Sequence, residues 1–219
     1  MIADPGPGSA EQGSFPSALV AVLEEASGLG FLGPGPVRPH LEHAAGFAEA
    51  LGPEAPPSSA VDLGSGGGVP GLVLATMWPA TSWTFVEAHR RRAAFLEAAA
   101  MRLGCSARVD VVAERAELVG RDPAHRGAYR VVVARSFGPP AVTAECGAPL
   151  LAAGGLLVVS EPPASEGTRW PAAGLALLGA APERVASLTK GTFQVIRQAL
   201  PCPERYPRRI GVPAKRPLF

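Results

Sequence analysis

The sequence predicts an α/β fold in which a mainly parallel sheet carries helices on both faces. Three observations support this prediction. From residue 59 onward, short apolar runs that suit buried strands alternate with amphipathic stretches of helical period. A glycine-rich segment at 61–71 continues the first apolar run and leads into a helix, as in doubly wound sheets. The last two apolar runs flank the turn Lys190-Gly191, which predicts a closing antiparallel pair.

The residues before 59 predict a small helical cap at 14–58. Residues 1–13 are rich in Gly, Pro, Ser and Ala, which predicts a disordered tail. Apolar residues at helical spacing predict helices at 14–26 and 40–51, and Ser14 or Ser17 can cap the first of them. Glycines and prolines at 28–39 separate the two helices, and a Pro-rich linker at 52–59 follows them.

The main domain at 59–203 alternates strands with helices. The predicted strands are 60–63, 82–86, 107–113, 129–134, 156–160, 184–188 and 192–199. The predicted helices are 71–77, 89–103, 140–151 and 170–178, with a loop or short helix at 114–119. Together these runs predict one seven-stranded sheet, followed by a basic, Pro-rich tail at 204–219.

The segment 61–71 predicts a ligand-binding turn. Its five glycines let the backbone approach a ligand closely, and Pro70 suits the first position of the next helix, whose terminal amides are free. The spacing Gly66-x-Gly68-x-x-Gly71 matches the dinucleotide fingerprint. Asp62 would repel a pyrophosphate, however, and could instead hold the ammonium of S-adenosylmethionine. A glycine turn that only packs a strand on a helix is the alternative.

Three further positions follow predicted strands at the same edge of the sheet. Glu87 ends the second strand and suits the ribose hydroxyls of an adenosine, whether in S-adenosylmethionine or in NAD. Ala116-Glu117 follows the third strand, where Glu117 or a neighbouring backbone group could contact the adenine, or Glu117 could simply be solvated. Arg135 follows the fourth strand, where its guanidinium could clamp an acceptor, stack on a base, or pair with an acid.

The residues after the fourth strand limit the acceptor chemistry. They are Arg135-Ser136-Phe137-Gly138-Pro139-Pro140, without the Asn-Pro-Pro-aromatic tetrad that serves exocyclic amines. No cysteine is placed to attack a pyrimidine carbon. Guanine N7 remains as an acceptor whose lone pair is free at neutral pH, and positioning alone would supply most of its acceleration.

Composition narrows the function classes. The net charge of +1 gives no global attraction for nucleic acid, so any basic patch must be local. Cys105, Cys146 and Cys202 show neither metal-ligand spacing nor a disulfide framework, which predicts reduced thiols, no metal and a cytoplasmic protein. No apolar run reaches membrane-spanning length, and residues 1–13 lack the pattern of a signal peptide.

The densest basic region is the tail at 204–219. Its cations are interleaved with prolines and with Tyr206, which suits RNA phosphates and a stacked base. The expected RNA contacts are Arg205, Arg208, Arg209, Lys215 and Arg216. The alternative is a solvated tail that folds over the edge of the domain.

Together, these segments resemble the glucose-inhibited division protein B family, the guanine-N7 methyltransferases of small-subunit (16S) ribosomal RNA. The matching stretches keep the family's order and spacing from residue 60 to the end. They are Asp62-Leu63-Gly64-Ser65-Gly66-Gly67-Gly68-Val69-Pro70-Gly71, Glu87 with Arg91-Arg92 and Phe95-Leu96, Arg115-Ala116-Glu117, Ala134-Arg135-Ser136-Phe137, and the tail 206–218.

The resemblance implies the Rossmann-like class I fold of S-adenosylmethionine-dependent methyltransferases, and that cofactor. Asp62 and the glycine loop would hold the methionine end, Glu87 the ribose and Ala116-Glu117 the adenine. The expected cofactor contacts are Asp62, Gly64, Ser65, Gly66, Val69, Glu87, Ala116, Glu117 and Arg135. Arg135 is also the expected catalytic residue, and the expected partner of this monomer is ribosomal RNA or the small ribosomal subunit.

Three stretches depart from the family pattern. Residues 28–39 replace a Trp-Asn…Asn-Leu-Thr segment, Ser136-Phe137-Gly138 replaces Ala-Phe-Ala, and the fifth strand ends Ser160-Glu161-Pro162-Pro163 instead of Lys-Gly. These changes bear on the acceptor more than on the cofactor. They leave as alternatives a methyltransferase for a small molecule or another RNA, an NAD(P)-dependent oxidoreductase, and a cofactor- and RNA-binding module without catalysis.

Overall fold

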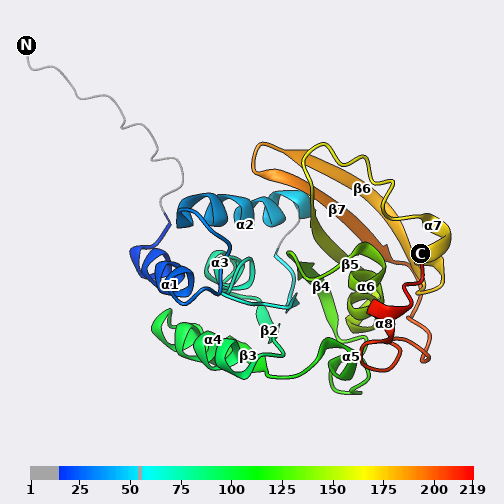
Figure 1. Ribbon diagram of the computed structural model, residues 1–219, viewed down its shortest axis with the longest axis horizontal. Helices are drawn as coiled ribbons and strands as arrows, with labels where there is room; N and C mark the ends of the chain where they lie inside the picture. The colour runs from blue at the N-terminus through cyan, green and yellow to red at the C-terminus, as the bar shows by residue number, and fades with distance from the viewer. Residues whose placement is uncertain (1–14, 54–55) are drawn as a thin grey trace, which may run out of the picture.

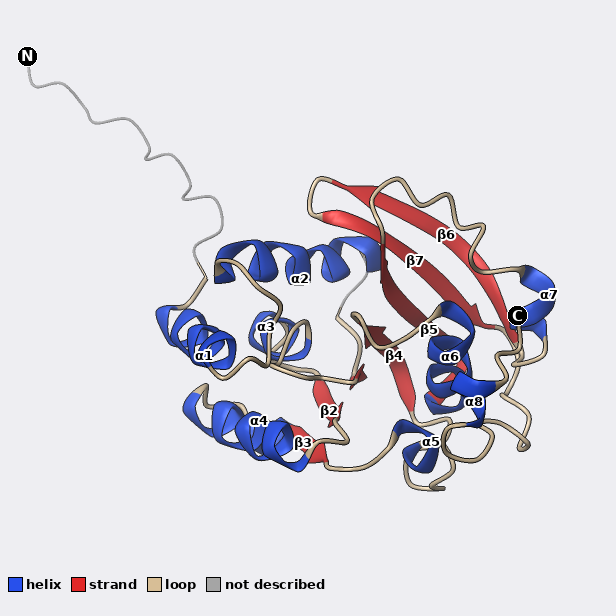
Figure 2. Cartoon of the chain, in the orientation of Figure 1, coloured by secondary structure: helices blue, strands red, loops and turns tan. Residues whose placement is uncertain are grey.

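A seven-stranded sheet forms the centre of the protein, in the order β3-β2-β1-β4-β5-β7-β6 (Figure 2). The computed structural model describes residues 15–53 and 56–219, so Ser14 and the expected disordered tail at 1–13 lie outside the described residues. The neighbours from β3 to β5 are parallel, whereas β7 runs antiparallel to both β5 and β6. The predicted α/β class and the closing antiparallel pair are therefore confirmed.

The strands are β1 (Ser59–Leu63), β2 (Ser82–Val86), β3 (Val109–Val112), β4 (Tyr129–Ala134), β5 (Leu151–Glu161), β6 (Ala180–Leu188) and β7 (Gly191–Gln198). The helices are α1 (Ser17–Gly28), α2 (Val37–Leu51), α3 (Gly71–Met77), α4 (Arg90–Arg102), α5 (Ala116–Val119), α6 (Pro140–Gly147), α7 (Ala172–Ala176) and α8 (Val212–Lys215). Two short 3-10 turns, η1 (Ser106–Arg108) and η2 (Ala148–Leu150), complete the regular structure of the described residues.

Helices cover both faces of the sheet. Because successive strand residues point to opposite faces, Val131 and Val133 of β4 join the core under α1 to α4, whereas Val132 and Ala134 join the core under α5 to α7. Figure 1 shows these two helical layers on either side of the central strands (Figure 1). Both cores are apolar, as expected for parallel strands buried on both faces.

The expected N-terminal cap is part of one helical layer. Helix α2 lies against α3 and against the three strands β5, β6 and β7. The ring of Phe47 on α2 packs edge-on to Phe193 of β7 at 4.8 Å between centroids. Helix α1 packs beside α2 in this layer, and Glu25 on α1 pairs with Arg102 on α4. Helices that precede β1 in the chain are therefore packed against the sheet.

Several predicted boundaries were wrong, each for a local reason. Helix α1 begins after Pro16, whose carbonyl accepts the first helical amides, so Ser17 does not cap it. The helix predicted at 140–151 ends at Gly147, and a 3-10 turn containing Pro149 leads into the strand, because proline lacks the amide that a helix needs. Strand β6 extends through Pro182, which an edge strand with a bulge tolerates.

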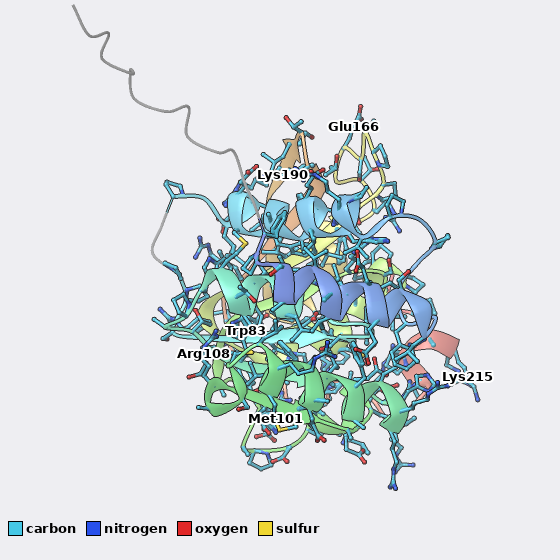
Figure 3. All side chains as sticks on the ribbon, turned by 90° about the vertical axis from the view of Figure 1, so that its left-hand side faces the viewer. Trp83, Met101, Arg108, Glu166, Lys190 and Lys215 are labelled. Carbon is cyan, nitrogen blue, oxygen red and sulfur yellow. The ribbon has the colours of Figure 1, made fainter. Side chains whose placement is uncertain are left out.

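The C-terminal tail folds against the domain. Tyr206 is buried, and the guanidinium of Arg208 contacts both oxygens of Glu145 on α6, at 2.8 and 2.6 Å. The Glu145 side chain is 0% exposed, and the backbone amide of Arg208 also donates to it. Lys215 on α8 points outward at the molecular surface in Figure 3 (Figure 3). The tail therefore contains both an internal anchor and exposed cations.

Replacing Arg208 with methionine is expected to lower the free energy of unfolding by about 3 kcal/mol, since it leaves the buried Glu145 carboxylate without its cation. The matched control is Arg209→Met, which changes an exposed arginine of the same tail and should alter stability by less than about 0.5 kcal/mol. Urea unfolding of the two variants measures the difference. Equal midpoints would contradict the structural role of Arg208.

Candidate functional site

The carboxyl ends of β1, β2, β4 and β5 lie at one edge of the sheet, and the loop 64–70 follows β1 at this edge. The amides of Gly64 and Ser65 both donate to the carbonyl of Val86, which fixes the loop to the end of β2. Gly64, Gly66 and Gly68 have φ of 74°, 56° and 91°, a conformation that favours glycine. The predicted glycine turn is thus present, and it opens α3.

Asp62 lies beneath this loop and is 1% exposed. Its Oδ2 accepts the amide of Gly71 at 2.9 Å, while Oδ1 has no hydrogen-bond partner among the described residues. Gly71 is required here because a Cβ at this position would lie 2.4 Å from Oδ2. Pro70 therefore precedes the helix, one residue earlier than predicted, and leaves the Gly71 amide free to bind the carboxylate.

Burial raises the pKa of Asp62 to about 7, although the Gly71 amide, the Ser65 hydroxyl and the Arg135 cation act in the opposite direction. The hydroxyl of Ser65 donates to the Asp62 carbonyl at 2.9 Å. A cationic ligand would stabilise the ionised form of this buried carboxyl group, because it would donate to the unused oxygen and offset the cost of removing the charge from water. This observation fits the ammonium that the sequence predicted.

Glu87 follows β2 directly and is 5% exposed. Its Oε2 accepts the amide of Gly66 at 2.9 Å, and its Oε1 accepts the amide of His89 at 2.8 Å. The carboxylate thus holds the glycine loop to the start of α4. Each oxygen keeps a second acceptor position, so ribose hydroxyls can be accommodated as well.

A cavity of about 260 Å³ opens beside Gly64. Its lining includes Val86, Glu114–Glu117, Phe137–Pro139, Val142, Cys146 and Ala214. The Glu117 side chain is engaged elsewhere, since it accepts the guanidinium of Arg115 and the Gly211 amide, both at 3.0 Å. Burial would raise the pKa of Glu117, but these partners hold it below its ordinary value. Backbone groups at Ala116 and Glu117 are therefore better placed than the carboxylate to face an adenine.

Arg135 follows β4, as predicted, and the structure shows that it is half-buried. Its Nη2 donates to Nδ1 of His40 on α2 at 2.6 Å, and the described residues include no acid within ion-pair distance of it. Burial and then the Arg135 cation lower the pKa of His40, which keeps that imidazole neutral and able to accept. The pairing with an acid considered from the sequence is not found.

The sequence did not indicate the residues that cover the loop. A Cβ on Gly67 would lie 2.7 Å from Leu32 and 2.9 Å from the Phe31 carbonyl, so the segment between α1 and α2 rests directly on the glycines. The Phe31 ring in turn meets Phe95 at 5.6 Å between centroids and the Arg91 guanidinium at 5.5 Å. Phe31 and Leu32 stood out in the sequence only as apolar residues among glycines and prolines.

Other predicted residues are placed as follows. Val69, within the loop 64–70, is buried at 7% exposure. Arg205, Arg209, Lys215 and Arg216 are exposed, whereas Arg208 pairs with Glu145. Burial raises the pKa of Cys105, Cys146 and Cys202, so these thiols are poor nucleophiles. Within 15–53 and 56–219, no helix is long and apolar enough to cross a membrane and no cluster of three metal-ligating side chains occurs.

A family model and the similar proteins compared with this chain carry the same name. The family model described as rRNA small subunit methyltransferase G matches residues 38–166. The ribosomal RNA small subunit methyltransferase G of Roseiflexus castenholzii is 39% identical over 169 residues, which are 74% of this chain and 72% of that protein. The protein of the same name from Prochlorococcus marinus (strain MIT 9313) is 40% identical over 169 residues, 74% of this chain and 68% of that protein.

Solved structures share the fold at low identity. An O-methyltransferase from Bacillus cereus in complex with SAH aligns with a TM-score of 0.60 at 12% identity, over 85% of this chain and 93% of that one. The O-methyltransferase TomG from Streptomyces achromogenes, in complex with SAM, aligns with a TM-score of 0.58 at 16% identity, over 85% and 92%. The predicted Rossmann-like class I fold is confirmed by these similarities.

Proposed function

This chain belongs to the rRNA small subunit methyltransferase G family, and we propose that it transfers a methyl group from S-adenosylmethionine to guanine N7 of small-subunit (16S) ribosomal RNA. The observation that carries the cofactor assignment is the buried Asp62, whose Oδ1 has no partner among the described residues. An ammonium satisfies this oxygen, whereas a pyrophosphate would be repelled by it. The site therefore favours the sulfonium cofactor over a dinucleotide, and an NAD(P)-dependent oxidoreductase is the weaker alternative.

The chain offers a contact for each part of this cofactor. The Oδ1 of Asp62, which has no partner among the described residues, suits the ammonium of the methionine end, and the acceptor positions left on Glu87 suit the ribose hydroxyls. The cavity beside Ala116 and Phe137 suits the adenine. When bound, the cofactor supplies an electrophilic methyl group on a positively charged sulfur.

The protein's part in the reaction is to position the acceptor. Guanine N7 carries a free lone pair at neutral pH and needs no general base, so orientation provides most of the rate acceleration. Arg135, held at the end of β4 by neutral His40, presents a guanidinium to the acceptor's carbonyl or phosphate oxygens. The exposed cations Arg205, Arg209, Lys215 and Arg216 suit the RNA backbone, whereas Arg208 serves as the anchor of the tail.

The proposal also covers the location and the assembly state of the protein. We place the activity in the cytoplasm, where small ribosomal subunits are made, and assign it to a monomer. The decisive experiment is mass spectrometry of small-subunit ribosomal RNA from cells with and without the protein. One 7-methylguanosine should disappear when the protein is absent and return with the wild-type chain. An unchanged modification pattern would exclude this substrate and leave a small molecule, another RNA, or a module without catalysis.

Glu87→Ala is expected to weaken the binding of S-adenosylhomocysteine by roughly 30-fold, because two hydrogen bonds to a charged acceptor are lost and the Gly66 amide loses its partner. The matched control is Glu97→Ala, which changes an exposed acid on α4 that lines neither the cavity beside Gly64 nor its neighbours at 136–140. Isothermal titration calorimetry measures both. Equal affinities of the two variants would remove Glu87 from the cofactor site.

A further inference from the structure

A second cavity, of about 290 Å³, adjoins the cofactor cavity. The two share Phe137 and Gly138, and of the next two residues Pro139 lines the cofactor cavity and Pro140 the second one, so a molecule in the second cavity lies next to the cofactor. Residues 159–162 at the end of β5 form another wall, and Arg169 and Trp170 complete it. The volume is close to the lower end of the range for small-ligand sites, which suits a single base better than a larger ligand.

The wall of this cavity contains a deeply buried acid. The side chain of Glu161 is only 2% exposed. Its Oε1 accepts Nη1 of Arg169 at 3.0 Å, and its Oε2 accepts the hydroxyl of Ser165 at 2.8 Å. A carboxylate has about four acceptor positions, so roughly two have no donor among the described residues. The indole Nε1 of Trp170 is also buried and lacks a hydrogen-bond partner among the described residues.

We propose that this cavity binds the acceptor guanine and that Glu161 is the residue that recognises it. This inference rests on the proposed function and specifies how the base is selected. Guanine carries two neighbouring donors, N1–H and N2–H, on its Watson–Crick edge, and these match the two oxygens of one carboxylate. Adenine, cytosine and uracil lack this pair of donors, so they would leave a buried acceptor unsatisfied.

The same orientation leaves the reacting atom free. N7 lies on the other side of the purine from N1 and N2, so a guanine held by Glu161 turns N7 away from the carboxylate and toward the shared wall. The Phe137 ring in that wall offers a face on which an unstacked base can lie, as in other sites that read single-stranded RNA. Base selection and methyl transfer therefore use opposite edges of one base.

A purely structural role for Glu161 makes a different prediction. In that case, the carboxylate only fixes the segment after β5 through Arg169 and Ser165, and removing either partner should be as harmful as removing the acid. The variants that separate the two roles are Glu161→Gln, Arg169→Met and Ser165→Ala. Glutamine keeps the size of the side chain but replaces one acceptor by a donor, which cannot accept from guanine.

The first measurement is methyl transfer from labelled S-adenosylmethionine to small ribosomal subunits from cells that lack the protein. Glu161→Gln should lower kcat/KM by roughly 10- to 100-fold, the discrimination typical of one bidentate base contact. Its affinity for S-adenosylhomocysteine should equal that of the wild type. Ser165→Ala should stay within about threefold of the wild type, and Arg169→Met should lose less than Glu161→Gln. Equal losses in Glu161→Gln and Arg169→Met, or none in Glu161→Gln, overturn the proposal.

The second measurement does not depend on the RNA substrate. Guanosine monophosphate is titrated into the full chain loaded with S-adenosylhomocysteine, beside inosine monophosphate, which lacks only the N2 amine. The wild type should prefer the guanine nucleotide by roughly 10-fold, and Glu161→Gln should remove the preference. If this preference is found but no label reaches ribosomal RNA, the proposed function fails and the guanine site stands. Equal binding of the two nucleotides, or no binding of either, overturns the guanine site.

Discussion

Replacing Arg135 with alanine is expected to slow methyl transfer to ribosomal RNA by about 100-fold, because the acceptor loses the group that orients it. The affinity for S-adenosylhomocysteine should change by less than about fivefold, since Arg135 affects Asp62 by charge and forms no ion pair with it. The position of Arg135 explains why the rate should fall much more than the cofactor affinity. Arg135 stands at the end of β4, half-buried, and its guanidinium donates to His40 and to no other side chain of the described residues.

Single-turnover assays with labelled cofactor, together with calorimetry, separate these two effects. Arg135→Lys should recover only part of the rate, because an ammonium keeps the charge but cannot present a planar fork of donors. Arg130→Ala is the matched control, since this exposed arginine lies at the opposite end of the same strand. A normal rate in Arg135→Ala, or a rate loss that is matched by a loss of cofactor affinity, would remove the assigned role.

The sequence predicted the parts of the site that local chemistry determines. Helix α3, strand β2 and strand β4 span the predicted residues, and a proline precedes α3 while a charged residue follows β2 and β4. The position of Asp62 under the glycine loop also follows from local order, since the acid and the helix terminus are nine residues apart on one strand–turn–helix unit. The position of Glu87 at the end of β2 was predicted in the same way, whereas its burial is seen only in the structure.

The remaining features depend on contacts between distant residues. The hydrogen bond between Arg135 and His40 joins residues 95 positions apart, and nothing in either local pattern indicates it. Leu32 covers Gly67 because α2 packs on the same sheet face as α3. Strand β5 is longer than its apolar run because Leu151 pairs with Tyr129 before a register shift, so pairing with β4 overrides the glycines at 154 and 155.

The tail illustrates how one composition can serve two purposes. The sequence predicts that its arginines contact RNA, because they are close together and are interleaved with prolines and a tyrosine. Burial of Glu145 at 0% exposure gives Arg208 a separate task, since a buried carboxylate needs a cation. The Gly211 amide likewise compensates Glu117 beside the cofactor cavity. Sequence alone cannot assign such roles, because both acids lie far upstream of the tail.

Asp62→Asn is expected to weaken S-adenosylhomocysteine binding about 100-fold near pH 7.5, because the ligand's ammonium loses a buried charge partner. The substitution should also remove the pH dependence of this affinity. The pKa of Asp62 in the folded protein is raised from 3.8 to about 7, mainly by burial, so below that pH the free protein holds a neutral acid. An ammonium favours the ionised form, so binding must release this proton, and wild-type affinity should rise with pH up to about 7 and then level off.

The free energy of unfolding should change with pH in the opposite direction to the affinity for the cofactor. Because the folded pKa lies above the ordinary value, Asp62 favours the folded state most below pH 3.8, and this contribution is lost as the pH rises through about 7. Calorimetry of the wild type and Asp62→Asn between about pH 5.5 and 7.5, with thermal unfolding at each pH, tests both signs. The Asp62→Asn variant should bind S-adenosylhomocysteine with a low affinity that hardly changes with pH. Over that range it should also lose less stability than the wild type. A wild-type affinity that does not change with pH would mean that the ammonium does not meet Asp62, and the cofactor would have to be oriented by Glu87 and the cavity beside Gly64 alone.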